Sequence, residues 1–140
     1  MTEFDTYVDD LASSIGTLVR RLRFETAEHE LSLTQRAVLA RLAREGERTI
    51  SDLARAEGMK PQSMSATVAN LEELGLIERK SHPTDGRQTN IALTREGQVV
   101  QSEMRAARRS WLRDQVAQLS TSEQKILFDA AHIMRRLGDR

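Results

Sequence analysis

The sequence of 140 residues contains no cysteine. This absence excludes disulfides, thiol-based redox sensing and any thiolate metal site, and it is typical of proteins that work in a reducing compartment. Aromatic residues are also scarce, with three Phe, one Tyr and one Trp. The core must therefore be built largely from Leu, Ile, Val, Ala and Met, a composition that favours helices.

Long apolar runs are missing as well. No window approaches the roughly 20 consecutive apolar residues that a membrane-spanning helix needs. The acidic start, Met1 to Asp5, lacks the basic region of a signal peptide. We therefore expect a cytoplasmic protein without a membrane partner, folded as a single unit over residues 1–140.

The sequence has no excess charge of either sign, because 21 Lys and Arg balance 21 Asp and Glu. A zero balance is not the electrostatic footprint of a nucleic-acid-binding protein, so composition alone argues mildly against DNA binding. The distribution is uneven, since residues 1–10 contain four acids and no base while arginines crowd the later half. Local clusters can supply phosphate contacts that the net charge hides.

Apolar periodicity predicts a long amphipathic helix near the N-terminus, over about residues 6–29. Leu11, Ile15 and Leu18 recur there at i, i+4 and i+7. A second, shorter helix is expected to begin with a cap at Thr34. Both helices have one apolar face, so each needs a surface to pack against.

Two further short helices are separated by a glycine turn, which is typical of a helix-turn-helix. The first is expected to open at Thr49 and to stop at Gly58. The second opens at Lys60-Pro61, because proline fits the first helical turn, and stops at Gly75.

Strand-like alternation follows in two runs, residues 77–80 and 89–93. The segment between them contains Pro83 and Asp85-Gly86, which are turn-forming residues. These features predict a β-hairpin with an exposed tip, placed directly after the helix-turn-helix. Such a hairpin is the wing of a winged helix-turn-helix.

The last part of the chain predicts a long helix capped by Thr94 and a final helix capped by Thr121 or Ser122. A central unit of about 60 residues cannot also bury the apolar stripes of three terminal helices. We therefore expect residues 1–30 and 95–140 to pair with a second copy in a symmetric homodimer. The candidate dimerisation residues are Leu11, Ile15, Leu18, Trp111, Ile126, Ile133 and Leu137.

The order of these elements resembles the MarR family of bacterial regulators over essentially the whole chain. The resemblance rests on residues 33–39, 52–54 and 71–77 and on Asp85-Gly86-Arg87, which matches the family's Asp-x-Arg wing motif. It implies a mainly α fold with a small β-hairpin wing. A winged helix-turn-helix DNA-binding lobe at residues 33–94 would be embedded in a helical dimerisation scaffold.

The fourth helix is the expected recognition helix. Its face opposite Met64, Val68 and Leu71 presents short side chains, which allow a close approach to base edges. A merely solvated face is the alternative. Family members often carry Arg where this chain has Ala66. We therefore expect few direct contacts to base edges, and we expect DNA recognition to depend more on the wing and on DNA shape. The candidate DNA-binding residues on this helix are Pro61, Gln62, Ser63, Ser65, Ala66 and Asn70.

On the wing, Arg87 is the strongest candidate, because a hairpin can carry a guanidinium into the narrow minor groove. Asp85 can orient that guanidinium through a charge-assisted hydrogen bond. The alternative is an Asx turn at Asp85 with a solvated Arg87. Arg79 and Lys80 are candidates for phosphate contacts, although a solvated strand edge explains them nearly as well.

Four arginines of the long helix have several possible roles. They could meet DNA, form salt bridges with the acidic first ten residues of the partner, or coat an exposed side, and we favour the last two. These residues are Arg105, Arg108, Arg109 and Arg113.

No metal or cofactor is expected, because His29, His82 and His132 are far apart in sequence and cysteine is absent. No phosphate loop, nucleophile elbow or paired carboxylates support an enzyme. The expected function is a repressor that binds a double-stranded DNA operator. The family resemblance implies release by a small anionic aromatic or phenolic effector, whose binding residues the spacing does not reveal. A winged helix used only for protein–protein assembly and a small enzyme remain as alternatives.

Overall fold

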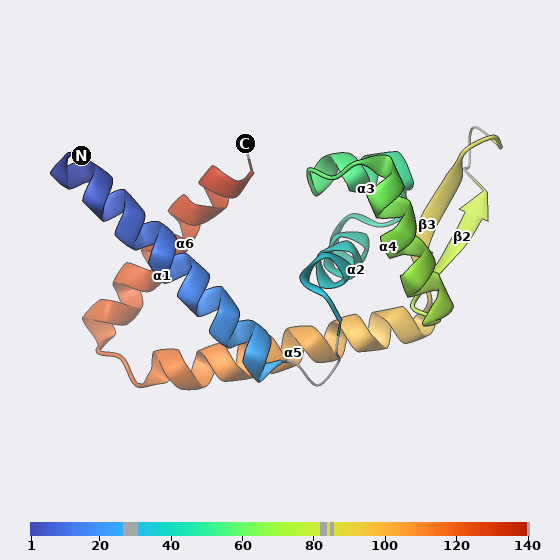
Figure 1. Ribbon diagram of the computed structural model, residues 1–140. Coiled ribbons are helices and arrows are strands. Elements are labelled where there is room, and N and C mark those ends of the chain that lie inside the picture. The colour runs from blue at the N-terminus through green and yellow to red at the C-terminus, as the bar shows by residue number, and fades with distance from the viewer. Residues whose placement is uncertain (27–30, 82–83, 85, 140) are drawn as a thin grey trace. The chain divides into compact units, whose positions relative to one another are not determined.

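The computed structural model describes residues 1–26, 31–81, 84 and 86–139. Over these residues the fold is mainly α-helical with a small sheet (Figure 1), which confirms the predicted fold class. The chain divides into two units, one made of residues 1–26 with 106–140 and the other of residues 27–105. The elements are α1 (Glu3–Glu25), α2 (Leu33–Glu45), β1 (Arg48–Thr49), α3 (Ile50–Ala56), α4 (Pro61–Glu73), β2 (Ile77–Ser81), β3 (Thr89–Leu93), α5 (Arg95–Ala117) and α6 (Thr121–Gly138).

The unit of residues 27–105 has its own hydrophobic core. It includes the predicted stripe of α4, since Met64, Val68 and Leu71 are fully buried. Because these three residues anchor α4, its opposite face is held outward. The buried apolar residues of this core are Val38, Leu39, Leu42, Leu53, Ala54, Met64, Val68, Leu71, Leu76, Ile77, Ile91 and Met104.

The helix-turn-helix follows the local chemistry of its sequence. Thr49 caps α3, as predicted, by accepting a hydrogen bond from the Asp52 N–H at 3.1 Å. The turn after α3 contains Gly58 at φ +64°, a conformation that glycine adopts without steric cost. The Met59 N–H closes the turn on the Ala54 carbonyl at 2.8 Å. Pro61 then starts α4 at its first position.

The wing belongs to a three-stranded antiparallel sheet in the order β1-β3-β2. Strands β2 and β3 form the predicted hairpin and lie beside α4 (Figure 1). The two-residue strand β1, which the sequence did not predict, pairs Arg48 with Ile91 and Thr49 with Asn90 of β3. A two-residue strand is too short to show alternation, so only its pairing partner reveals it.

Three predicted helix starts are wrong, because reciprocal capping boxes begin these helices earlier. In each box a Ser or Thr accepts from the N–H three residues later, whose side chain accepts from the cap N–H. Helix α1 therefore begins at Glu3 and ends at Glu25, rather than covering 6–29. The caps of α2 and α6 are not Thr34 and Thr121 or Ser122. The actual capping pairs are Thr2 with Asp5, Ser32 with Gln35, and Ser120 with Glu123.

Helix α5 begins at Arg95, directly after the predicted cap Thr94, and its first turn is fixed against the lobe by close backbone packing. The Thr94 hydroxyl accepts from the Gly97 N–H at 3.0 Å and donates to the Gly75 carbonyl at 2.6 Å. Gly97 is buried, and a Cβ there would overlap the Leu76 carbonyl oxygen. Glycine is thus the residue that lets the start of α5 lie directly against the segment between α4 and β2.

The other unit contains two amphipathic helices with little to pack against. No described residue of α1 or α6 is buried, although the helices run for 23 and 18 residues. The predicted dimerisation residues Leu11, Ile133 and Leu137 are about half exposed. In the described segments, no helix is long and apolar enough to cross a membrane.

Candidate nucleic-acid interface

Helix α4 presents a polar surface of short side chains. All six predicted recognition-helix residues are exposed, and all of them except Pro61 lie on the side of the helix away from the buried stripe that anchors it. Gln62 and Ser65 are one turn apart on this surface, so both could reach the edges of neighbouring base pairs. The Thr67 hydroxyl donates to the Ser63 carbonyl at 3.2 Å and is directed at its own helix.

Lys60, which directly precedes α4, was not among the predicted DNA-binding residues. Its side chain is exposed and makes no capping hydrogen bond. Within the described part of the chain, no carboxylate lies within ion-pair distance of it. A cation at the N-terminus of a recognition helix suits a phosphate contact. The sequence signal for a role of this lysine is its position directly before Pro61, the residue that starts the recognition helix.

The two phosphate candidates of β2 occupy different surroundings. Successive residues of a strand point to opposite faces, so a phosphate contact by Arg79 would not imply one by Lys80. Arg79 donates from Nε to the Glu72 carboxylate of α4 at 3.2 Å. Both side chains of this pair are 41% exposed, so the pair is weak and can open for another anion.

Lys80 lies among acids. Its Nζ is 3.5 Å from Glu78 and 4.0 Å from Glu47, whose carboxylate also accepts from the buried Asn90 amide at 3.4 Å. These neighbours offset the lysine charge locally. Lys80 therefore favours a phosphate contact less than its sequence position suggests.

Arg87 lies at the exposed end of the wing, between β2 and β3. Gly86 and Gln88 beside it are also exposed, so the hairpin presents this end to solvent. Asp85 lies outside the described residues, as do Pro83 and the histidines at 29 and 82. The predicted pairing of Asp85 with Arg87 thus stays a prediction.

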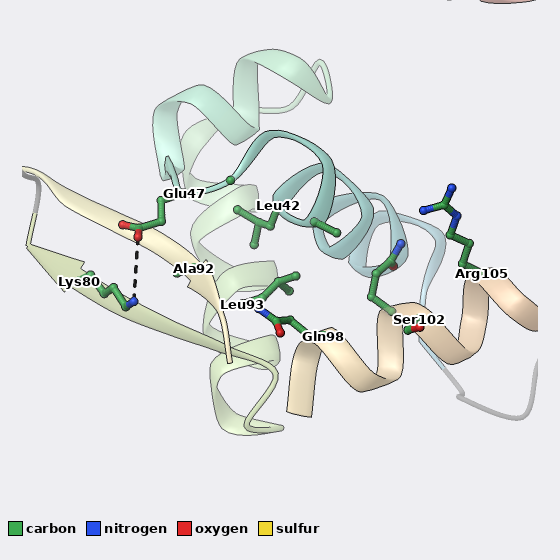
Figure 2. Close-up of a pocket in the computed structure, with 11 residues that line it drawn as sticks. Leu42, Glu47, Lys80, Ala92, Leu93, Gln98, Ser102 and Arg105 are labelled. Atoms are coloured by element: carbon green, nitrogen blue, oxygen red, sulfur yellow. Dashed lines mark ion pairs between the residues drawn. The ribbon is translucent and has the colours of Figure 1, made fainter. Parts of the chain in front are cut away.

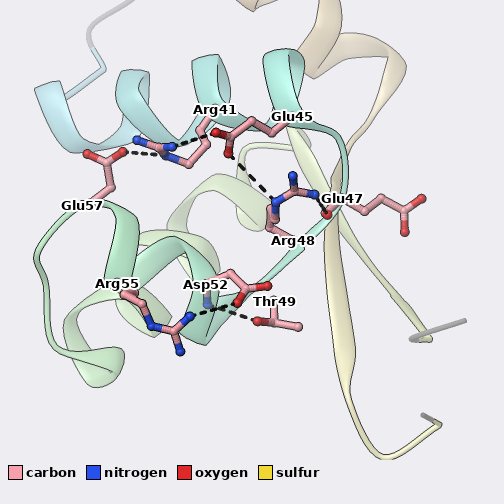
Figure 3. A network of polar contacts seen from close by, with 8 residues as sticks. All are labelled: Arg41, Glu45, Glu47, Arg48, Thr49, Asp52, Arg55 and Glu57. Carbon is pink, nitrogen blue, oxygen red and sulfur yellow. Dashed lines mark hydrogen bonds and ion pairs between the residues drawn. The ribbon is translucent and has the colours of Figure 1, made fainter. Parts of the chain in front are cut away.

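A polar network holds the helix-turn-helix on α2 (Figure 3). Arg41 donates from Nε to Glu57 at 3.1 Å and from Nη1 to Glu45 at 3.0 Å. Partial burial lowers the pKa of Arg41, but the hydrogen bonds and charges of the two glutamates outweigh it and raise the pKa above its ordinary value. Because Glu57 directly precedes the turn at Gly58, this clamp positions the segment that leads into α4.

A pocket of about 500 Å³ lies on the side of the sheet that faces α2 and α5 (Figure 2). Its apolar floor includes Leu42, Ala92 and Leu93, and its polar groups come largely from the first turns of α5. The sequence signal for this pocket is a set of polar residues at helical spacing near the start of α5. The polar lining residues are Glu47, Lys80, Gln98, Gln101, Ser102 and Arg105.

Titratable side chains do not gather into a metal site in the segments that the structure describes. No group of three or more His, Asp or Glu side chains there could hold a metal ion.

Comparisons with known proteins agree on one family. The model of the MarR family matches residues 29–88, the span of the helix-turn-helix and most of the wing. The chain is 38% identical to a helix-turn-helix-type transcriptional regulator of Mycobacterium bovis, covering 93% of this chain and 91% of that protein. It is 27% identical to the helix-turn-helix-type transcriptional repressor MdtR of Bacillus subtilis, covering 99% and 90%.

The fold is also similar to solved structures. The crystal structure of Rv1404 from Mycobacterium tuberculosis matches with a TM-score of 0.89 and 25% identity, covering 100% of this chain and 97% of that one. The likeness therefore extends over the terminal helices as well as the helix-turn-helix and wing.

Proposed function

This chain belongs to the MarR family of helix-turn-helix transcriptional regulators, and we propose that it is a repressor that binds a DNA operator as a homodimer. One observation carries the proposal: α4 is anchored by a fully buried stripe and turns an exposed face of short, mostly polar side chains outward. The wing beside it carries an exposed arginine. A recognition helix in the major groove and an arginine in the minor groove need this arrangement.

The dimer part of the proposal rests on α1 and α6. Isolated helices of this length are marginally stable in water, and most helical stability in proteins comes from packing an apolar face. In the single chain that packing is missing, because the apolar stripes of both helices are exposed. A second copy would bury them and would set two recognition helices in symmetric positions.

Salt dependence tests DNA binding against the alternative of a protein–protein module. Phosphate neutralisation releases counterions, so about six phosphate contacts would weaken binding roughly 10³-fold between 50 and 200 mM salt. We expect a steep fall of this kind for a fragment that flanks the protein's own gene. No binding to any such fragment, even at low salt, would favour the module instead.

Contacts to the DNA bases and contacts to the DNA phosphates should be weakened by different mutations. Gln62→Ala and Ser65→Ala should relax the preference at particular base pairs, each by about 1 kcal/mol, because each removes a hydrogen-bonding group from the groove. Lys60→Ala should weaken binding to all sequences alike and reduce the salt slope by about 1. Binding-site selection measures the first effect and titration at several salt concentrations the second. An unchanged preference in Gln62→Ala would show that Gln62 does not read a base.

The proposal also includes release of the protein from its operator by a small-molecule effector. The pocket between the sheet, α2 and α5 supports it, because Arg105, Gln98 and Gln101 could bind a carboxylate above an apolar floor. Lys80, at the same pocket, belongs to the wing, so an anion there would compete with Glu47 for the lysine. We expect benzoate to weaken operator binding by the wild type and not by Arg105→Ala. Equal effects on both proteins would place the effector elsewhere.

A further inference from the structure

The pocket between the sheet, α2 and α5 carries different charges at its two ends. Figure 2 shows Glu47 beside Lys80 at the end nearest the wing and Arg105 at the opposite end. Gln98 and Ser102 lie between these ends, on the same face of α5 as Arg105. Gln98 and Arg105 are two helical turns apart, so this polar face alone extends over about 10 Å. The pocket is therefore long enough for a molecule with a different group at each end.

The carboxylate of Glu47 is the acceptor at the wing end. Both of its side-chain contacts among the described residues are long, because the Asn90 amide donates to it at 3.4 Å and the Lys80 Nζ lies at 4.0 Å. Charge-assisted hydrogen bonds are normally about 2.7–2.9 Å long, and a carboxylate has about four acceptor positions. The Glu47 side chain is also 41% exposed. It can therefore accept from a further cationic donor at closer range.

Lys80 does not neutralise the wing end of the pocket. Its Nζ is 3.5 Å from Glu78 and 4.0 Å from Glu47, so two carboxylates share one ammonium group. The cluster of these three residues keeps an excess of negative charge. A second ammonium group, brought by a ligand, would complete the charge balance at Glu47.

The opposite end of the pocket is positive. Arg105 is exposed, and in the segments that the structure describes no carboxylate lies within ion-pair distance of it. A guanidinium can bind a carboxylate through two parallel hydrogen bonds. Between the two ends, the floor of Leu42, Ala92 and Leu93 offers an apolar surface to the body of a ligand.

We propose that this pocket takes an elongated zwitterion, with its carboxylate at Arg105, its ammonium group at Glu47 and an apolar body over the floor between them. The inference rests on the effector proposed above and names the chemical class of that effector. A single benzoate ring can pair with Arg105 but is too short to reach Glu47 as well. The second charge would therefore distinguish the true ligands from simple aromatic acids.

Three probes of one shape test both ends of the pocket in the wild-type protein. The first is a biphenyl with a carboxylate at one end and an aminomethyl group at the other. The second lacks the aminomethyl group, and the third lacks the carboxylate. In calorimetric titrations at neutral pH and fixed salt, the zwitterion should bind about fivefold more tightly than either singly charged probe, because a partly exposed charge pair contributes modestly.

Substitutions assign each charge to its residue. Glu47→Gln keeps the size of the side chain and an acceptor for Asn90, and it should bind the zwitterion no more tightly than the acid. Arg105→Gln should bind the zwitterion no more tightly than the amine. The matched control is Glu78→Gln, which removes the same charge from the same cluster at a residue that does not line the pocket. It should keep the wild-type preference, and melting temperatures check that all three variants fold.

The outcomes separate this inference from the effector proposal. A wild-type protein that binds the acid as tightly as the zwitterion, or that binds none of the three probes, would overturn the inference. A preference that survives Glu47→Gln would also overturn it. Release of the operator is measured separately: equal release by the acid and the zwitterion would leave the effector proposal standing without the zwitterion. Selective binding of the zwitterion without any release would support the site and overturn the effector proposal.

Discussion

Arg87→Ala is expected to abolish most operator binding while leaving dimerisation and thermal stability nearly unchanged. The side chain is exposed at the end of the wing and contributes nothing to the core of the lobe, so its removal should change the free energy of unfolding by less than about 0.5 kcal/mol. The complex should lose far more, because an arginine inserted in the minor groove gives up its contacts to a narrow, strongly negative groove.

Arg87→Lys is the matched variant for this prediction. It keeps the positive charge but lacks the planar fork, and an ammonium is more strongly hydrated, so binding should recover only in part. The measurement is the operator affinity of both variants at one fixed salt concentration, beside their melting temperatures. If Arg87→Ala bound like the wild type, the wing would have no part in recognition and α4 would be the only reader.

Replacing Ile133 and Leu137 of α6 by Glu should convert the proposed dimer into monomers or insoluble protein. Both side chains lie on one apolar stripe and are about half exposed in the single chain. Burying two unpaired carboxylates in a dimer interface would cost several kcal/mol. In the proposed dimer the two half-sites of an operator would be engaged together, so operator affinity should fall with the loss of the dimer.

The control for this variant is Lys125→Gln with Arg136→Gln. It changes the net charge by the same amount on the polar face of the same helix, so it should stay dimeric. Analytical ultracentrifugation at micromolar concentration measures both proteins. If the variant carrying Ile133→Glu and Leu137→Glu stayed a soluble dimer of wild-type affinity, this face of α6 would be excluded from the interface.

Much of the lobe could be predicted because its helices and strands are marked by apolar periodicity and turn residues within short stretches of sequence. The stripe of Met64, Val68 and Leu71 follows from helical periodicity alone, and the structure buries all three. Pro61 and the positive-φ Gly58 act within their own turns, so the bounds of the helix-turn-helix were visible in the sequence. The same holds for the alternation that places β2 and β3.

The features that escaped prediction depend on distant partners. Strand β1 exists because residues 48–49 pair with β3, some forty residues later, and its two residues carry no pattern of their own. The acidic surroundings of Lys80 arise partly from Glu47 in another element, so the sequence could not show that its charge is offset. The clamp between Arg41 and Glu57 likewise joins residues from separate parts of the lobe.

Protection mapping on the DNA that flanks the protein's own gene tests the central claim most directly. A homodimer that places two copies of α4 in the major groove should protect two half-sites related by a twofold axis. Their centres should lie one helical turn apart, about 10 base pairs, or a multiple of that spacing. Protection should disappear for Arg87→Ala at the same protein concentration. A single unpaired site, or no protection at low salt, would contradict the account of a dimeric operator-binding regulator.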